Sequence, residues 1–156
     1  MKQHTVLRVV SKLLLPLILL FALYVQFHGD FGPGGGFQAG VIFASGIILY
    51  ALIYDLDAAR HAVPVYALRL CASAGVLLYA SVGLVAMLRG GTFLDYSALA
   101  ERPQSGQHWG ILLIELGVGV TVAAVMILIF YAFAGRAGAI RRRQSDVDAD
   151  SHSHGS

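Results

Sequence analysis

The sequence is poor in charge, in cysteine and in motifs that carry chemistry. Only 13% of its 156 residues are Asp, Glu, Lys or Arg, whereas soluble domains carry about a quarter. Cys71 is the single cysteine and stands in an apolar run, which excludes a disulfide within the chain and predicts a buried, inert thiol. No nucleophile, metal-ligand cluster or cofactor motif is apparent. The sequence therefore predicts neither an enzyme nor a cofactor, a metal site or a nucleic-acid partner.

Long apolar runs are what the sequence does contain, since 57% of its residues are hydrophobic and the mean hydropathy is +0.71. A membrane core about 30 Å thick is crossed by about 20 mostly apolar residues in a helix, because lipid offers the backbone no hydrogen-bond partner. Four runs meet this requirement, at residues 6–27, 37–54, 65–88 and 108–133. They lack the polar faces of helices in a soluble bundle. The sequence predicts an all-α integral membrane protein with four transmembrane helices.

The first run follows a basic start, so a cleaved signal peptide is an alternative to a first membrane helix. The small residues of a cleavage site are missing, however, because Tyr24, Gln26 and Phe27 occupy the end of the run. An uncleaved first helix is expected.

The basic residues predict the orientation. Nine of the eleven Lys and Arg residues lie at the N-terminus, around the second loop or at the C-terminal end, and two lie around the third loop. Cytoplasmic loops carry the excess of Lys and Arg, so both termini are expected in the cytoplasm. Residues 1–140 are expected to form the membrane domain, and residues 141–156 a disordered polar tail. Asp55, Asp57 and Arg60 are expected to make a hydrated turn on the inner side.

Glu115 is the only acidic residue well inside a predicted span. If its helix begins near residue 108, it lies about 10 Å deep, where a charge is costly unless it faces protein or water. Gly119 and Ala123 follow on the same face and permit close approach of another helix. Two interpretations stay open. Glu115 is either a proton- or cation-binding carboxylate, or a hydrogen-bonded group that only holds helices together.

Other small and polar residues of the spans are expected to serve packing. The second run carries a small-residue patch at Gly40, Ala44 and Gly46. Pro16 is expected to kink the first helix. The hydroxyl groups inside the spans are expected to bond to the preceding turn of their own helix, at Ser45, Ser73, Ser81 and Thr121.

The segment HGDFGPGGGFQAG, residues 28–40, joins the first two runs. Residues 34–39 fit the G-x-G-x-x-A dinucleotide pattern, but that pattern needs a preceding strand, and both neighbours here are predicted membrane helices. Glycine permits positive φ and close approach, while Pro33 stiffens the entry. The segment is either a bare turn or an irregular stretch at membrane depth, which is tolerated only where protein or water covers it.

The run PGGGFQAG, preceded by HGDFG, resembles the signature of the MnhB/MrpB family, the small B-type component of the Mrp-type multisubunit sodium/proton antiporters, also called Mnh or Sha. The length and the four-helix count are similar too, so the likeness covers roughly residues 1–140. Glu115 is not part of this signature. The loop positions expected to serve assembly and packing are His28, Asp30, Pro33, Gly34, Gly35, Gly36, Phe37, Gln38 and Gly40.

The resemblance implies a plasma-membrane complex that exchanges cytoplasmic sodium for external protons. It implies partner subunits of the A, C, D, E, F and G types, of which the A and D types carry the main proton-path machinery in that family. The small B-type component is needed for the assembled activity. Two alternatives stay open: a purely structural membrane subunit, and an accessory subunit of a membrane-bound hydrogenase-like complex, in which related domains also occur.

Overall fold

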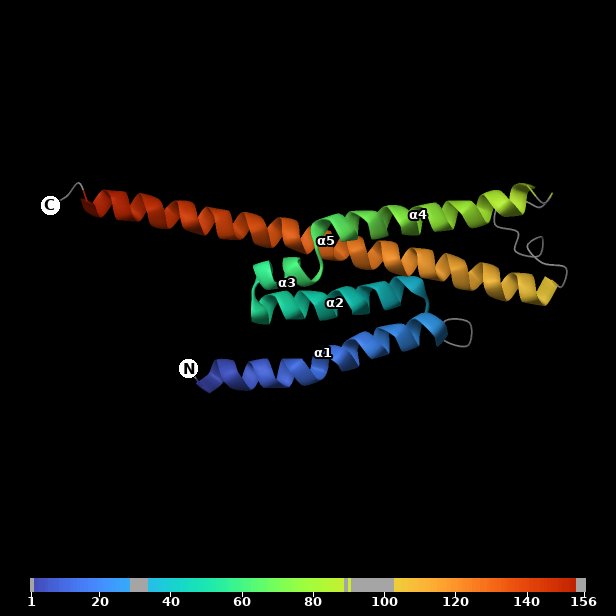
Figure 1. Cartoon of the computed structure of the whole chain (residues 1–156), viewed down its shortest axis with the longest axis horizontal. Helices are drawn as coiled ribbons and strands as arrows, with labels where there is room; N and C mark the ends of the chain where they lie inside the picture. The colour runs from blue at the N-terminus through green and yellow to red at the C-terminus, as the bar shows by residue number, and fades with distance from the viewer. Residues whose placement is uncertain (1, 29–33, 89, 91–102, 154–156) are drawn as a thin grey trace.

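The computed structural model describes residues 2–28, 34–88, 90 and 103–153, and every regular element in these ranges is an α-helix. There are four long helices and one short helix, α3, which lies between α2 and α4. The longest helix, α5, extends beyond the length needed to cross a membrane (Figure 1). The helices are α1 (Lys2–His28), α2 (Gly36–Tyr54), α3 (Leu56–Ala62), α4 (Val65–Leu88) and α5 (Pro103–Ser153).

The prediction of four helical spans is confirmed. Four stretches of the described residues are long and apolar enough to cross a membrane: Val6–His28, Gly36–Tyr54, Val65–Leu88 and Gly110–Gly138. Each lies close to a predicted run. Pro16 lies inside α1, and Figure 1 shows α1 changing direction near its middle, as the prolyl ring requires.

The long helices lie in a row in the order α1, α2, α5, α4 (Figure 1). Extensive contacts join α1 to α2, α2 to α5 and α5 to α4, whereas α1 meets α5 only slightly. We call the end where α1 stops and α2 begins at Gly36 the glycine end. We call the end where α1 begins and α2 passes into α3 the terminal end, since the C-terminal part of α5 leaves the bundle there.

Small residues allow the helices to approach each other closely, as expected where lipid gives little hydrophobic drive for association. A β-carbon added to Gly40 of α2 would lie 2.5 Å from the Gly119 carbonyl oxygen and 3.2 Å from the Ala123 nitrogen of α5. One added to Gly46 would lie 3.1 Å from Leu19 of α1. The small residues predicted to serve packing, Gly40 and Gly46 on α2 and Gly119 and Ala123 on α5, therefore lie at contacts between helices, as expected.

The seam between α4 and α5 uses glycine in the same way, at positions that the sequence pattern did not single out. A β-carbon on Gly75 would overlap the Thr121 hydroxyl and lie 2.6 Å from the Gly117 carbonyl oxygen. The Thr121 hydroxyl donates to the Gly117 carbonyl at 2.8 Å. Ser45 and Ser81 also donate to carbonyls of their own helices, so the expectation for hydroxyl groups is confirmed at these three positions.

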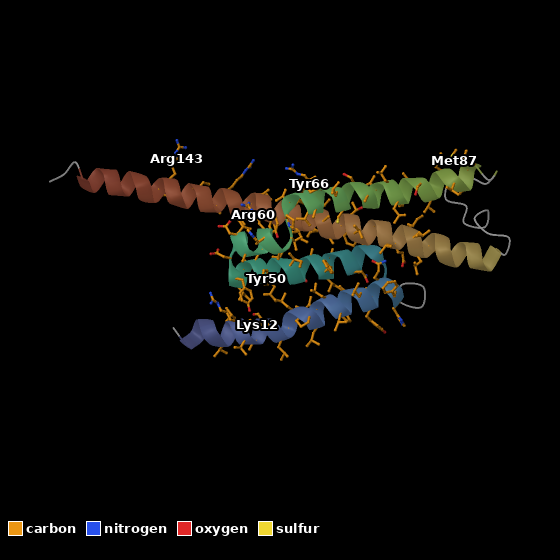
Figure 2. All side chains as sticks on the ribbon, viewed as in Figure 1. Lys12, Tyr50, Arg60, Tyr66, Met87 and Arg143 are labelled. Atoms are coloured by element: carbon orange, nitrogen blue, oxygen red, sulfur yellow. The ribbon has the colours of Figure 1, made fainter. Side chains whose placement is uncertain are left out.

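The stretch between α2 and α4 that was expected to be a hydrated turn forms the short helix α3, on which Asp57 is exposed as expected, as is Asp55 before it. Asp55 takes a φ of 92°, which ends α2, and its carboxylate accepts a hydrogen bond from the Leu56 backbone N–H at 3.2 Å, which caps α3. Arg60 is not a solvated residue of this turn, because its side chain packs against α5 (Figure 2). Pro64 separates α3 from α4.

Two further expectations differ from the structure. Cys71 is exposed rather than buried, because α4 packs substantially against α5 alone and most of its surface stays uncovered. The stretch expected to be disordered from residue 141 onward is helical as far as Ser153. Arg, Gln and Ala favour helix, and neither glycine nor proline interrupts residues 139–154.

Candidate functional site

Gly35 and Gly36, the second and third of the three consecutive glycines in the signature run, make the entry into α2. Gly35 caps the helix with φ 126° and ψ 174°, a conformation that is essentially confined to glycine. Its carbonyl oxygen accepts a hydrogen bond from the Ala39 backbone N–H at 3.0 Å, so the regular hydrogen bonding of α2 begins in its first turn. Both glycines are buried. The sequence therefore places a tightly turned, side-chain-free backbone at the start of α2.

This entry packs directly against Glu115 of α5. A β-carbon on Gly35 would lie 3.2 Å from the Glu115 Oε1 atom. A β-carbon on Gly36 would overlap the Glu115 carbonyl oxygen and lie 3.0 Å from its Cα. Glu115 itself is half-buried. The glycine run and the single intramembrane carboxylate, which are about 80 residues apart in the sequence, thus form one site.

The electrostatics of this contact favour a negative charge on Glu115. The first-turn N–H groups of a helix have no carbonyl partner inside the helix, and the macrodipole places partial positive charge at that end. Gly35 has no side chain with which to cap α2, and the Glu115 carboxylate from α5 lies beside that position. The helix N-terminus can therefore contribute to stabilising the carboxylate.

A third helix, α1, reaches the same junction through Gln26, which was not among the predicted site residues. Its amide lies against Gly119, one turn along α5 from Glu115, and a β-carbon on Gly119 would overlap the amide oxygen. The same β-carbon would lie 3.0 Å from the Gly36 carbonyl oxygen. Gln26 is only 8% exposed. A polar residue near the end of an apolar run was the one available signal, but such residues usually face water.

The junction lies deep relative to the ends of α4 and α5. Twelve residues of α5 precede Glu115, which corresponds to about 18 Å of helix. Figure 1 shows α4 and α5 extending past the α1–α2 pair at the glycine end. The start of α2 is therefore recessed relative to the ends of α4 and α5.

The other predicted loop residues divide into three groups. Gly40 is buried against α5 and so belongs to the packed side, and Gly34 is half-buried. Phe37 is 63% exposed and Gln38 is exposed, so their side chains point away from the contact with α5. His28 is exposed and stacks on Tyr24, with ring centroids 4.9 Å apart. Asp30 and Pro33 lie outside the described residues.

A second polar cluster lies at the terminal end. The Arg60 Nη2 atom donates to the Tyr131 carbonyl oxygen at 3.3 Å, and its guanidinium lies 5.8 Å from the centre of the Tyr131 ring. The Tyr131 hydroxyl donates to the Val63 carbonyl at 3.3 Å. Within the described ranges, no three His, Cys, Asp or Glu residues are placed to hold a metal ion. This cluster ties α3 and the loop after it to α5.

Comparison with known proteins gives consistent matches. A family model described as "Domain related to MnhB subunit of Na+/H+ antiporter" matches residues 6–128. The chain is 38% identical over 92 residues to the B-type subunit of a Na(+)/H(+) antiporter of Bacillus subtilis (strain 168), covering 59% of this chain and 64% of that protein, just under two thirds of its length. It is 36% identical over 122 residues to "Putative antiporter subunit mnhB2" of Staphylococcus aureus (strain Newman), covering 76% of this chain and 86% of that protein.

Proposed function

The chain belongs to the MnhB family, and from this premise we propose that it is a small membrane subunit of a multisubunit sodium/proton antiporter. The observation that carries the proposal is the contact between the family's glycine run and Glu115. An intramembrane carboxylate is expensive and marks an ion or proton site by default. Here the backbone of α2 is shaped to meet it.

The described interior of the chain contains too few polar groups for transport by this chain alone. Among the described residues, the buried polar side chains besides Tyr131 are Gln26 and Ser11, and the Ser11 hydroxyl donates to the Leu7 carbonyl of its own helix. Tyr131 is 16 residues from Glu115 on α5, or about 24 Å. The buried α5 residues between Gly119 and Tyr131 are Ala124 and Ile127. A path across the membrane therefore needs groups from partner subunits.

The row of helices leaves room for such partners. The edge helices α1 and α4 each pack substantially against one neighbour, and large apolar side chains along both stay exposed. Other antiporter subunits, of the A, C, D, E, F and G types, would cover part of this surface and lipid the rest. Phe37, exposed beside the buried glycines, is placed to contact one of them.

We assign the glycine end to the outer face of the plasma membrane and both termini to the cytoplasm. Figure 2 shows Lys12, Arg60 and Arg143 toward the terminal end, and positive charge gathers on the cytoplasmic side of membrane proteins. Glu115 then exchanges ions or protons with the outer side. Sodium and a proton compete for the same carboxylate oxygens, which is the chemistry an antiporter requires.

Replacement of Glu115 by Gln tests the proposal. The amide keeps an oxygen that can cap α2 but cannot take up a proton or carry a charge, so we expect assembly to persist and antiport to fall at least about tenfold, roughly 1.4 kcal/mol or more in the barrier. Antiport is measured as sodium-driven proton movement in membrane vesicles that contain the whole complex. The Ser81→Ala variant, which removes a hydroxyl bonded to its own helix, serves as the control.

Unchanged antiport in an assembled Glu115→Gln complex would reject the ion-path role and favour a purely structural subunit. Loss of the complex in that variant, with Glu115→Asp also failing to assemble, would point in the same direction, because capping and packing would then account for the residue.

A further inference from the structure

We propose that Arg8 and Lys12 of α1, held beside Tyr54 of α2, form a binding site for the phosphate headgroup of an anionic phospholipid at the terminal end. The inference goes beyond the antiporter function, because it needs only that the helices span a membrane. It starts from two positive charges that no acidic residue of the described chain neutralises.

The two cations share one face of α1 beside the seam with α2. Arg8 and Lys12 lie four residues apart, which places their side chains next to each other on the helix surface. The Tyr54 hydroxyl donates to the Arg8 carbonyl oxygen at 3.3 Å, and the Arg8 guanidinium lies 6.0 Å from the centre of the Tyr54 ring. Tyr50 stacks on Tyr54 with ring centroids 4.8 Å apart, and Figure 2 shows Lys12 and Tyr50 at the terminal end. The cations therefore lie beside an aromatic pair that closes α2.

Neither cation has an acidic partner among the described residues. Both side chains are exposed, and besides the Tyr54 ring no interaction of the Arg8 guanidinium or the Lys12 ammonium with the described chain is found. Asp55 follows Tyr54, but its carboxylate caps α3 and forms an ion pair with neither cation. Two neighbouring positive charges without a counter-ion attract an anion from outside the chain.

Lys12 lies deeper in the membrane than a charge is easily tolerated. It is six residues into the apolar stretch that begins at Val6, about 9 Å along the helix axis, and a charge among acyl chains is costly. A lysine relieves this cost by extending its four-carbon stem to the interface, and helical side chains tilt toward the N-terminus of their helix. The Lys12 ammonium thereby reaches back toward the level of Arg8, so both charges meet the layer of lipid phosphates.

A phospholipid matches the whole of this surface. Arg presents a planar set of donors that fits a phosphate, and Lys adds a point charge. Basic residues at the membrane surface attract anionic headgroups. Beyond the two cations, Leu13, Leu17 and Leu20 of α1 are each more than half exposed and offer apolar surface to the acyl chains. A free phosphate ion would use the charges but leave that apolar surface uncovered.

The first test uses the wild-type complex. The complex is purified in mild detergent and incubated with phosphatidylglycerol that carries a photoreactive group near its phosphate, and labelled peptides are identified by mass spectrometry. We expect label within residues 6–15, and we expect unlabelled phosphatidylglycerol to reduce it at least about fivefold more than the same concentration of phosphatidylcholine.

Three results of this test would overturn the proposal. The first is an absence of label from residues 6–15, as when an acidic segment of a partner subunit occupies the cations. The second is equal competition by phosphatidylglycerol and phosphatidylcholine, which would mean that the negative charge is not recognised. The third is competition by inorganic phosphate as strong as that by phosphatidylglycerol, because the ligand would then be the free ion.

The second test removes the charges. The Arg8→Gln/Lys12→Gln double variant should raise the phosphatidylglycerol concentration for half-maximal labelling at least about tenfold, because each basic residue contributes about 1 kcal/mol, or roughly fivefold. Arg8→Lys/Lys12→Arg keeps both charges and should stay within about threefold of the wild-type value. The matched control is Arg69→Gln/Arg143→Gln, which removes two exposed charges from α4 and α5 and should leave the value within about twofold.

A role of the two cations in orienting α1 alone predicts a different result. It would lower the amount of assembled complex in the double glutamine variant without changing the half-maximal concentration in the complex that remains, and this would overturn the proposal. If that variant does not assemble, Lys12→Gln decides, with an expected rise of about fivefold. The readout is lipid labelling, so loss of the antiporter function would leave this test intact.

Discussion

At the glycine end α2 meets α5 backbone to backbone, with Gly36 against the carbonyl of Glu115, whereas at the terminal end α3 meets α5 through the long side chains of Arg60 and Tyr131. The first contact depends on the absence of side chains, so any added atom collides with main chain that cannot rotate away. The second depends on side-chain groups, and each loss is limited to one hydrogen bond or one ring contact. The two ends should therefore respond very differently to substitution.

The largest effect is expected for Gly36→Ala. Its β-carbon would overlap the Glu115 carbonyl, so α2 and α5 must separate, and overpacking of this kind costs about 1–3 kcal/mol or more. We expect little assembled complex and loss of antiport. The measurement is co-purification of partner subunits in mild detergent, with a thermal-stability profile of whatever complex remains.

Gly138→Ala is the matched control for that substitution. Gly138 is also a helical glycine, in α5, but within the described part of the chain nothing lies within 4 Å of its added β-carbon. We expect wild-type assembly, with a slight gain because alanine favours helix over glycine by about 1 kcal/mol. Equal behaviour of the two variants would show that the contact between α2 and Glu115 does not hold the glycine end together.

An intermediate effect is expected for Gly35→Ala. The φ of 126° and ψ of 174° strain any side chain by about 1–3 kcal/mol, but the nearest atom to the new methyl group is the end of the flexible Glu115 side chain at 3.2 Å. The complex should assemble with a lower thermal midpoint and reduced antiport, because the carboxylate is displaced.

Gly90→Ala separates backbone strain from that displacement. Gly90 also has a positive φ, of 84°, yet no atom of the described residues lies within 4 Å of its added β-carbon. We expect it to lose stability, by about 1–2 kcal/mol, while its antiport per assembled complex stays at the wild-type level. A similar fall in antiport for Gly35→Ala and Gly90→Ala would show that backbone strain, and not displacement of the Glu115 carboxylate, lowers the activity of Gly35→Ala.

The two ends also differ in how far the sequence predicted them. The spans, the small faces at Gly40 and Gly119, and Glu115 as the one acidic residue well inside a span follow from composition and four-residue spacing, because both patterns are local. The glycine run was identified by resemblance. That this run packs on Glu115 could not be predicted, since a pairing of α2 with α5 rather than with α4 depends on how the whole row assembles.

The residues that the sequence did not reveal are polar groups whose environment is set by tertiary contact. Gln26 at the end of a run and Arg60 in a short turn both resemble ordinary interfacial residues. Gln26 is buried because Gly119 leaves space for its amide. Arg60 is half-buried because Gly135 leaves space for its guanidinium, whose Nη2 atom would lie 2.8 Å from a β-carbon there. Each burial depends on a glycine more than 70 residues away, which no local pattern encodes.

The smallest effect is expected at the terminal end, for Arg60→Met. Methionine keeps the apolar stem against Tyr131 and Gly135 but loses the hydrogen bond to the Tyr131 carbonyl and the cation–π contact, together about 1–2 kcal/mol. Part of that loss is offset, because the Arg60 Nε atom is buried without a hydrogen-bond partner among the described residues, and its desolvation is relieved. The net change should be within about 1 kcal/mol, seen as a small fall in thermal midpoint with antiport retained.

Arg69→Met removes the same positive charge from an exposed position, so it controls for the loss of charge on this side of the membrane. A larger fall for Arg60→Met than for Gly35→Ala would reverse the ranking of the two ends and show that side-chain contacts, not bare backbone, carry the stability of the bundle.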